Sequence, residues 1–254
     1  MDDPLDTPPV RVLNPNGRHP CVLVCEHASH TIPPAYGTLG LPDAALTSHI
    51  AWDPGAFDTA REMSALLDAP LVYGTVSRLV YDCNRPPEAA SAMPAQSEDT
   101  VIPGNLDLTP DARAARTRSV YEPFEQRLSE VLSRRALPPV LATVHSFTPT
   151  FLGTPRDVEI GILHDRDARL ADAMLARVDG FTCRRNAPYG PDDGVTHTLR
   201  RHALPRGLLN VMIEIRNDLI ASAEPCQRMA KLLAIWLSHS ISDALAAPAQ
   251  VGRL

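Results

Sequence analysis

Short apolar runs alternate with longer segments of helical periodicity along this chain, and this alternation constrains the fold more than any other feature. Apolar runs of about four to eight residues that are rich in β-branched side chains are typical of buried strands. Segments in which apolar residues recur every three or four positions are typical of helices packed on a sheet. Strands that alternate with helices predict an α/β domain with a mostly parallel central sheet. The expected strands span residues 21–25, 71–73, 79–81, 140–144, 158–163 and 208–215.

Helix signals fall between these strands. Asp53 and Pro54 predict the start of one helix, because aspartate is a favoured N-cap and proline is tolerated at the first helical position. A second helix is expected from Thr109, and Pro123 should bend or interrupt it because proline lacks the N–H that a helix interior requires. The remaining helices are expected over residues 167–178 and 225–240.

The length of 254 residues fits one large domain. Residues 1–19 show no regular pattern and are expected to form a loose N-terminal arm, followed by a single domain over residues 20–254. Residues 86–110 are rich in proline, alanine, serine and aspartate, which predicts a long surface loop. Loops of this length in a compact domain are usually functional or mobile.

The overall charge argues against nucleic acid as a partner. The formal net charge is −6, and lysine and arginine are dispersed rather than gathered into the basic stripe of a nucleic-acid binder. The five cysteines form no C-x-x-C pair, which argues against both a disulfide framework and a thiolate zinc site. The sequence shows no signal peptide and no apolar run long enough to span a membrane. These features predict a cytoplasmic protein with no membrane partner.

Polar side chains stand at the carboxyl ends of three predicted strands. His27 follows the first strand, His145 follows the strand at 140–144, and Glu214 lies near the end of the last strand. Ligands of open α/β sheets bind outside these strand ends, so we expect the three side chains to lie in one region. Histidine and carboxylate are ligands of catalytic zinc, and a further glutamate can act as a general base. A hydrogen-bonded core histidine is the alternative for each imidazole, and the residues alone leave both interpretations open.

A second polar group surrounds the strand predicted at 79–81. Arg78 and Arg85 flank this strand, and Asn84 lies between them. Two guanidinium groups and an amide can fix a carboxylate through several charge-assisted hydrogen bonds. Ordinary ion pairing, with Asp82 as the partner, is the simpler interpretation from composition alone.

Seven short motifs occur in order between about residue 20 and residue 240. They are Cys25-Glu26-His27-Ala28-Ser29, Ile32-Pro33, Trp52-Asp53-Pro54-Gly55, Ser77-Arg78, Asp82-Cys83-Asn84-Arg85, His145-Ser146-Phe147-Thr148-Pro149 and Glu214-Ile215-Arg216-Asn217-Asp218. Each motif alone is weak, whereas the ordered set is specific. The set resembles the N-formylglutamate amidohydrolase family over nearly the whole chain.

The resemblance implies a fold and a reaction. The fold would be a three-layer α/β/α sandwich with a mostly parallel or mixed central sheet, similar to that of zinc exopeptidases. The cofactor would be one zinc ion, and the reaction would be hydrolysis of the N-acyl amide of a small acidic amino acid. For N-formylglutamate the products would be formate and glutamate.

The resemblance also implies roles for individual residues. His27 and His145 match the family's histidines and would bind the zinc ion. Glu214 would be the general base that takes a proton from water and passes it to the leaving amine. The residues expected to bind the substrate are Arg78, Asn84, Arg85 and Arg216.

The third metal ligand has more than one candidate. Asp53 is the expected ligand. Glu26 adjoins His27, but neighbours on a strand point to opposite faces, so both could bind one ion only if the strand is broken there. His30 stands where related zinc peptidases carry a glutamate ligand, so it also remains open.

Other functions fit the sequence less well. No G-x-S-x-G motif indicates a serine hydrolase, and Cys25 lies in an apolar strand where a thiol is usually inert. Another N-acyl-amino-acid deacylase or a carboxypeptidase-like hydrolase would use the same residues. A non-catalytic binding protein on this fold would be expected to have lost a ligand or the base, and His27, His145 and Glu214 are all present.

Overall fold

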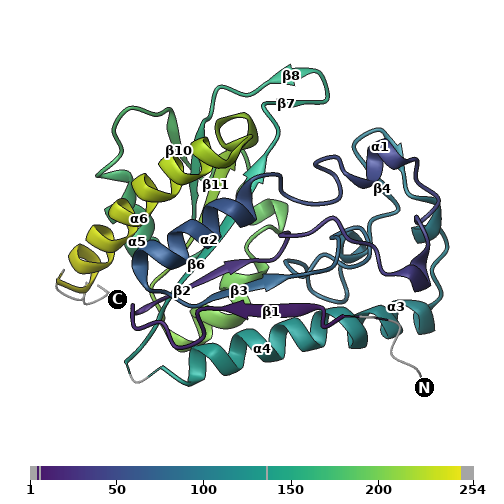
Figure 1. Cartoon of the computed structure of the whole chain (residues 1–254), viewed down its shortest axis with the longest axis horizontal. Coiled ribbons are helices and arrows are strands. Elements are labelled where there is room, and N and C mark those ends of the chain that lie inside the picture. The colour runs from purple at the N-terminus through teal and green to yellow at the C-terminus, as the bar shows by residue number, and fades with distance from the viewer. Residues whose placement is uncertain (1–4, 6, 136, 247–254) are drawn as a thin grey trace.

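A seven-stranded mixed sheet forms the centre of the molecule (Figure 1), and the computed structural model describes residues 5, 7–135 and 137–246. Its strands are β1 (Val10–Leu13), β2 (Cys21–Cys25), β3 (Leu71–Gly74), β6 (Val140–Phe147), β9 (Ile160–Leu163), β10 (Cys183–Arg185) and β11 (Asn210–Arg216). The order across the sheet is β1-β3-β2-β6-β11-β9-β10. Strands β3, β2, β6 and β11 run parallel, whereas β1 is antiparallel to β3 and β9 is antiparallel to β11.

The central strands are apolar because both faces of the sheet are covered. Strand β2 is buried along its whole length, and alternate side chains enter two different cores. Val22 and Val24 pack on one face, while Leu23 and Cys25 pack on the other. A strand buried on both faces therefore appears in the sequence as a continuous apolar run.

Helices cover the two faces of the sheet (Figure 1), which confirms the three-layer α/β/α sandwich. The helices are α1 (Asp43–Leu46), α2 (Ala56–Leu67), α3 (Pro110–Arg116), α4 (Glu122–Ser133), α5 (Arg169–Leu175) and α6 (Ala223–Ala246). Helices α2, α5 and α6 share a core with Leu23 and Cys25, and α4 shares the opposite core with Val22 and Val24. No helix in the described part of the chain is long and apolar enough to cross a membrane.

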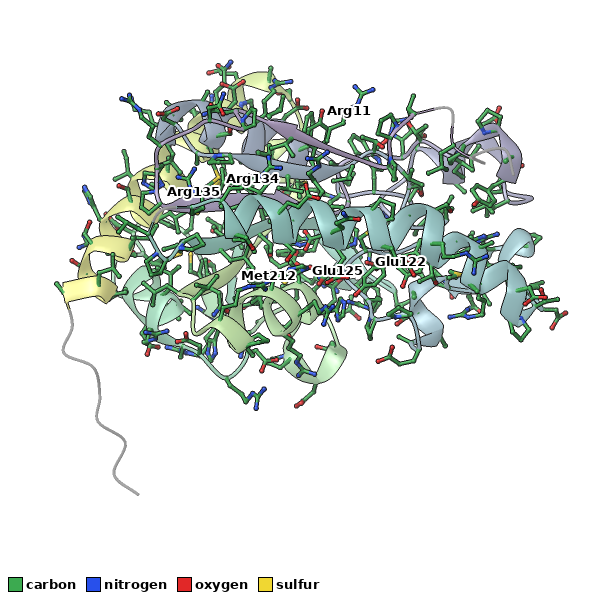
Figure 2. All side chains as sticks on the ribbon, turned by 90° about the horizontal axis from the view of Figure 1, so that it is seen from below. Arg11, Glu122, Glu125, Arg134, Arg135 and Met212 are labelled. Carbon is green, nitrogen blue, oxygen red and sulfur yellow. The ribbon has the colours of Figure 1, made fainter. Side chains whose placement is uncertain are left out.

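Helix α4 crosses one face of the sheet with charges that match its dipole (Figure 2). Glu122 and Glu125 lie in its first turn, and Arg134 and Arg135 follow its last residue. Negative charge at a helix N-terminus and positive charge at its C-terminus each contribute about 0.3–1 kcal/mol. This arrangement stabilises the longest element on that face.

Two segments differ from the sequence expectation, and a third agrees with it. Residues 79–81 form a buried turn, so their apolar character reflects burial rather than a strand. Residues 10–13, expected within the N-terminal arm, form β1 and pair with β3. The helix expected from Thr109 is interrupted as expected, because a π-helical turn at Thr117–Tyr121, just before Pro123, divides it into α3 and α4. The assignment of residues 20–254 to one domain stays a prediction.

Helix α2 begins later than its sequence signal. Asp53 is not the N-cap, because the helix starts at Ala56 after Gly55. Gly55 has a φ of +78°, and a Cβ atom there would lie 2.3 Å from the carbonyl oxygen of Ile220. Only glycine fits this position. The turn leaves the carboxylate of Asp53 free for another role.

Two loop segments extend beyond the carboxyl ends of the central strands (Figure 1). They carry the hairpins β4 (Gln96–Ser97) with β5 (Thr100–Val101) and β7 (Thr150–Phe151) with β8 (Thr154–Pro155). Buried Arg116 anchors the loop that carries β4 and β5. It donates hydrogen bonds to the carbonyl oxygens of Val80 and Gly104 and to Oδ1 of Asn105. Both hairpins thus stand beside the edge where the site is expected.

Candidate active site and metal centre

A cavity of about 480 Å³ lies at the carboxyl ends of β6 and β11. Residues of both hairpin-bearing loops line it, so the long loop at 86–110 does border the site. Of the residues predicted for the site, the cavity lining includes His27, Asp53, Arg78, Asn84, Arg85, His145 and Glu214.

The sheet places His145 and Glu214 side by side. They are direct partners in the parallel register of β6 and β11, so their side chains project from the same face of the sheet. His27 lies two residues beyond the end of β2. A backbone hydrogen bond of 3.0 Å from Asp53 N to His27 O joins the loop before α2 to the loop after β2. Four separate chain segments therefore meet at this edge.

Asp53 lies between the two histidines. Its Oδ2 atom is 3.3 Å from Nδ1 of His27 and 2.9 Å from Nδ1 of His145. One ligand atom from each of these residues lies within 4.8 Å of the others, and all three side chains are buried. Two imidazole nitrogens and one carboxylate oxygen that converge in this way form a set of donors that could hold a metal ion.

The Nε2 atom of each imidazole, which points away from Asp53, faces a second carboxylate. His27 Nε2 lies 2.7 Å from Asp82 Oδ1, and His145 Nε2 lies 3.1 Å from Glu26 Oε2. The second contact is an ion pair outside hydrogen-bond geometry. Metal-binding histidines commonly direct their other ring nitrogen toward a carboxylate, which fixes the ring and raises its basicity.

This geometry bears on the two alternative third ligands. Glu26 lies on the far side of the His145 ring from Asp53, and its Oε1 accepts a 2.5 Å hydrogen bond from Thr198. His30 is exposed and packs against the ring of Trp52, with ring centroids 4.9 Å apart. Neither side chain belongs to the cluster of converging donors.

The buried charges of the cluster balance one another. Burial and Arg78 act to lower the pKa of His27, but Asp82 and Asp53 raise it overall. Burial acts in the same way on His145, yet Glu26 and Asp53 hold its pKa well above the usual range. Both imidazoles are therefore stabilised in the protonated, positively charged form when no metal is bound.

The two carboxylates that contact His27 show the opposite shift. Burial would raise the pKa of Asp53, but His27 and the hydrogen bond with His145 lower it below its usual range. Burial would likewise raise the pKa of Asp82, which His27 and Arg78 hold well below normal. Each buried anion thus has a buried or half-buried cation beside it.

Glu214 differs from the other carboxylates of the site. Its Oε2 atom is buried and has no hydrogen-bond partner in the described part of the chain. Burial raises its pKa to about 7, and Asp53 adds to the increase, although His145, His27 and Arg78 act against it. A buried carboxyl group without a partner costs free energy, and such groups are concentrated at functional sites.

Arg78 joins the two carboxylates that flank His27. Its Nη1 lies 3.3 Å from Asp53 Oδ1, and its Nη2 lies 2.7 Å from Asp82 Oδ2. The side chain is 27% exposed and lines the cavity. Two of its donors are therefore committed to the protein before any substrate enters.

Asn84 and Arg85 are held against the loop that carries Val195. Asn84 donates to the Val195 carbonyl oxygen at 2.5 Å and accepts from Thr198 N at 3.0 Å. Arg85 Nη1 donates to the carbonyl oxygens of Asn84 and Gly194. No carboxylate in the described part of the chain forms an ion pair with Arg85, so its charge is available in the cavity.

Arg216, expected to bind substrate, does not line the cavity. Its Nε lies 2.8 Å from Asp218, its Nη2 lies 3.7 Å from Glu159, and its Nη1 donates to the Arg156 carbonyl oxygen. The guanidinium group is thus neutralised at the end of β11, which argues against the expected role. The expected role of Arg216 came from the family resemblance alone, and these contacts do not support it.

Two roles were missed at the sequence level. Asp82 was considered only as a partner for arginine, yet it contacts His27, and Glu26 contacts His145 rather than competing for the metal. Both acids lie beside buried apolar residues in the sequence, and a charge in such a run is the signal that could have indicated a buried partner.

The fold and this cluster define a three-layer α/β/α protein with a His–Asp–His set of the kind that holds a metal ion. The family model of N-formylglutamate amidohydrolase matches residues 19–221, and the chain belongs to this family.

Solved structures with the same fold are available for comparison. A gene product from Agrobacterium tumefaciens is 55% identical, with 93% of this chain and 96% of that chain covered and a TM-score of 0.92. An N-formylglutamate amidohydrolase from Ralstonia eutropha is 19% identical, with 95% of this chain and 100% of that chain covered and a TM-score of 0.62. The second similarity concerns the fold alone. No protein with a curated function matches this chain.

Proposed function

We propose that this chain is a zinc-dependent amidohydrolase that cleaves the N-acyl amide of a small acidic amino acid, with N-formylglutamate as the substrate that yields formate and glutamate. Membership of the family supports amide hydrolysis. The observation that carries the proposal is the position of Glu214, an unpartnered carboxyl group beside the His27–Asp53–His145 cluster in one cavity.

The cluster fits a divalent ion in both donor type and charge. His27, Asp53 and His145 would hold the ion, and Asp82 and Glu26 would orient the two rings. Metal binding requires neutral imidazoles, so two imidazolium protons would leave as one dication arrives, and the net charge of the buried cluster would be unchanged. A zinc ion bound there supplies a lowered pKa for water and polarisation of the amide carbonyl.

Glu214 would move the protons of the reaction. Its carboxylate accepts a proton as water adds to the carbonyl carbon, and it returns that proton to the amide nitrogen as the C–N bond breaks. The products are a carboxylic acid, which ionises in water, and a free amine. A base whose pKa is raised to about 7 is well matched to this exchange near neutral pH.

Arg85 would bind the substrate carboxylate. Its guanidinium group lines the cavity without a carboxylate partner, and it can form charge-assisted hydrogen bonds with a carboxylate. Asn84 would contribute indirectly by holding the Val195 loop beside it. Arg78 would keep Asp53 and Asp82 in place and present its remaining donors to the cavity.

The reaction is tested with a panel of N-formyl, N-acetyl and N-succinyl amino acids assayed with zinc present. We expect turnover of N-formylglutamate with release of formate, and no turnover by Glu214→Gln. Turnover of other acyl groups alone would identify a different deacylase of the same mechanism. Turnover of none would favour a non-catalytic binding protein.

We also propose a cytoplasmic location. All five cysteines are free thiols, and four of them are buried. Unpaired cysteines are typical of a reducing compartment.

A further inference from the structure

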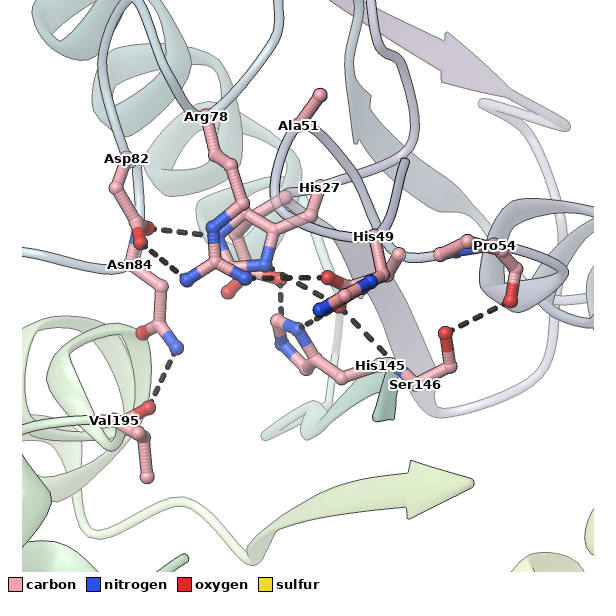
Figure 3. Close-up of polar contacts among 12 residues, drawn as sticks. His27, His49, Ala51, Pro54, Arg78, Asp82, Asn84, His145, Ser146 and Val195 are labelled. Atoms are coloured by element: carbon pink, nitrogen blue, oxygen red, sulfur yellow. Dashed lines mark hydrogen bonds and ion pairs between the residues drawn. The ribbon is translucent and has the colours of Figure 1, made fainter. Parts of the chain in front are cut away.

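Most hydrogen-bond donors of the cavity wall near the cluster are already committed within the protein. Arg78 holds two carboxylates, and Ser146 Oγ donates to the Pro54 carbonyl oxygen at 2.8 Å (Figure 3). Thr148 Oγ1 donates to the Thr150 carbonyl oxygen at 2.9 Å. A carbonyl oxygen that gains negative charge during amide hydrolysis therefore finds few free donors on this part of the wall besides those that Arg78 retains.

Tyr189 supplies such a donor. It lines the same cavity as Glu214, and its hydroxyl oxygen accepts a 2.9 Å hydrogen bond from Arg156 Nη2. In the described part of the chain the hydroxyl proton is not donated to any acceptor. Burial raises the pKa of Tyr189, and Arg156 acts against the increase without reversing it, so the proton stays on the oxygen at neutral pH.

Arg156 is fixed in place by three aromatic rings. Its guanidinium carbon lies 4.9 Å from the ring centroid of Tyr189, 4.6 Å from that of Phe151 and 5.5 Å from that of Phe147. Its Nη1 donates to the Thr148 carbonyl oxygen at 3.3 Å. No carboxylate in the described ranges pairs with it. A full positive charge at the phenol oxygen makes the hydroxyl a stronger donor and restricts its rotation.

We propose that Tyr189 is a further catalytic residue, whose hydroxyl donates a hydrogen bond to the oxygen of the scissile carbonyl as negative charge develops on it. Arg156 is then a positioning residue that acts through Tyr189. No covalent bond forms on the tyrosine, and its proton remains on the phenol oxygen. The inference rests on the proposed amide hydrolysis, since it assigns a role within that reaction.

The first test compares Tyr189→Phe with wild type under zinc-saturated conditions. Loss of one donor to an oxyanion lowers kcat by about 10²-fold to 10³-fold, and we expect a decrease of about 10²-fold with KM within about twofold. Zinc content should be unchanged. Tyr121→Phe is the matched control, because it also removes a buried phenol hydrogen bond, to His197, but lies outside the cavity lining. An unchanged kcat in Tyr189→Phe would overturn the proposal.

The second test asks whether Arg156 acts through the phenol. Arg156→Gln should lower kcat by about tenfold, which is a smaller decrease than that expected for Tyr189→Phe because the hydroxyl donor itself is retained. Arg156→Lys should restore part of the lost kcat. In a Tyr189→Phe background, Arg156→Gln should have little further effect. Equal effects of Arg156→Gln in both backgrounds would show a purely structural role for the arginine and reject its positioning role.

A binding measurement separates this inference from the proposed function. The probe is a phosphinate isostere of N-formylglutamate, in which a tetrahedral phosphinate replaces the formamide, titrated by calorimetry into the zinc-saturated protein. Tyr189→Phe should weaken its binding by about the same factor as kcat and leave glutamate binding unchanged. Wild-type turnover with equal phosphinate affinity in both proteins would refute the role of Tyr189 alone. A wild-type protein that neither turns over the amides nor binds the phosphinate would refute the proposed function and this inference together.

Discussion

Replacement of Glu214 by glutamine should have opposite effects on activity and stability. Glutamine cannot accept a proton, so kcat should fall by about 10²-fold to 10⁴-fold, the usual contribution of a general base. The metal-free folded protein should become more stable at alkaline pH. The reason is that wild type must bury an ionised carboxylate there without a hydrogen-bond partner for its Oε2.

The size of the stability effect follows from the pKa. Burial raises the pKa of Glu214 from 4.5 to about 7 in the folded protein. The folded state therefore binds this proton more tightly than the unfolded chain, and the resulting stabilisation is complete below pH 4.5 and is lost as pH rises through 7. Relative to acidic pH, where Glu214 is neutral in both the folded and the unfolded state, the stability lost by ionisation is about 1.4 kcal/mol at pH 5.5 and about 3.4 kcal/mol at pH 8.

Urea denaturation in the presence of a chelator measures this cost. Any cost of burying the glutamine amide is the same at both pH values, so the comparison between them isolates the ionisation. The stability of Glu214→Gln relative to wild type should increase by about 2 kcal/mol from pH 5.5 to pH 8. Glu224→Gln, which alters an exposed glutamate, is the control and should change stability by less than about 0.5 kcal/mol at both pH values. A relative stability that does not depend on pH would refute the interpretation of Glu214 as a buried group of raised pKa.

Two further variants examine the surroundings of the cluster. Glu26→Gln should weaken zinc affinity by about 10-fold to 100-fold in a competition titration, because His145 loses its charged partner, and an unchanged affinity would exclude that role. Arg85→Ala should raise KM for carboxylate substrates by about tenfold while kcat changes little, since a lost bond between charged groups is worth about 1.5–3 kcal/mol. The same substitution should not alter KM for a neutral amide analogue of the substrate, and equal effects on both substrates would argue against carboxylate binding.

Much of the fold could be predicted because burial leaves a direct pattern in the sequence. Strands β2, β6 and β11 are buried on both faces, so their apolar runs are continuous and their ends are visible. Residues 79–81 have the same composition but form a turn, because a buried turn and a buried strand both require apolar side chains. The sequence of strand β1 is not a continuous apolar run, because this strand lies at the edge of the sheet and pairs with only one neighbour.

The site could be predicted where strand ends define it. His145 and Glu214 were expected to lie together because parallel strands bring their carboxyl ends to one edge, and the register places them opposite one another. Contacts between distant loops could not be predicted in this way. Tyr189 and Arg156 are in contact only because the β7–β8 segment and the 186–194 segment fold over the same cavity. This contact leaves no periodic pattern in the sequence.

Zinc content per chain tests the central claim most directly. Wild type dialysed against zinc and then against buffer should retain about one ion per chain, measured by mass spectrometry of the metal. Asp53→Asn should retain almost none, because the substitution removes the carboxylate that lies between His27 and His145. Glu214→Gln should retain the ion as wild type does. A wild-type protein without zinc, or an Asp53→Asn variant that binds zinc as tightly as wild type, would contradict the proposed metal centre.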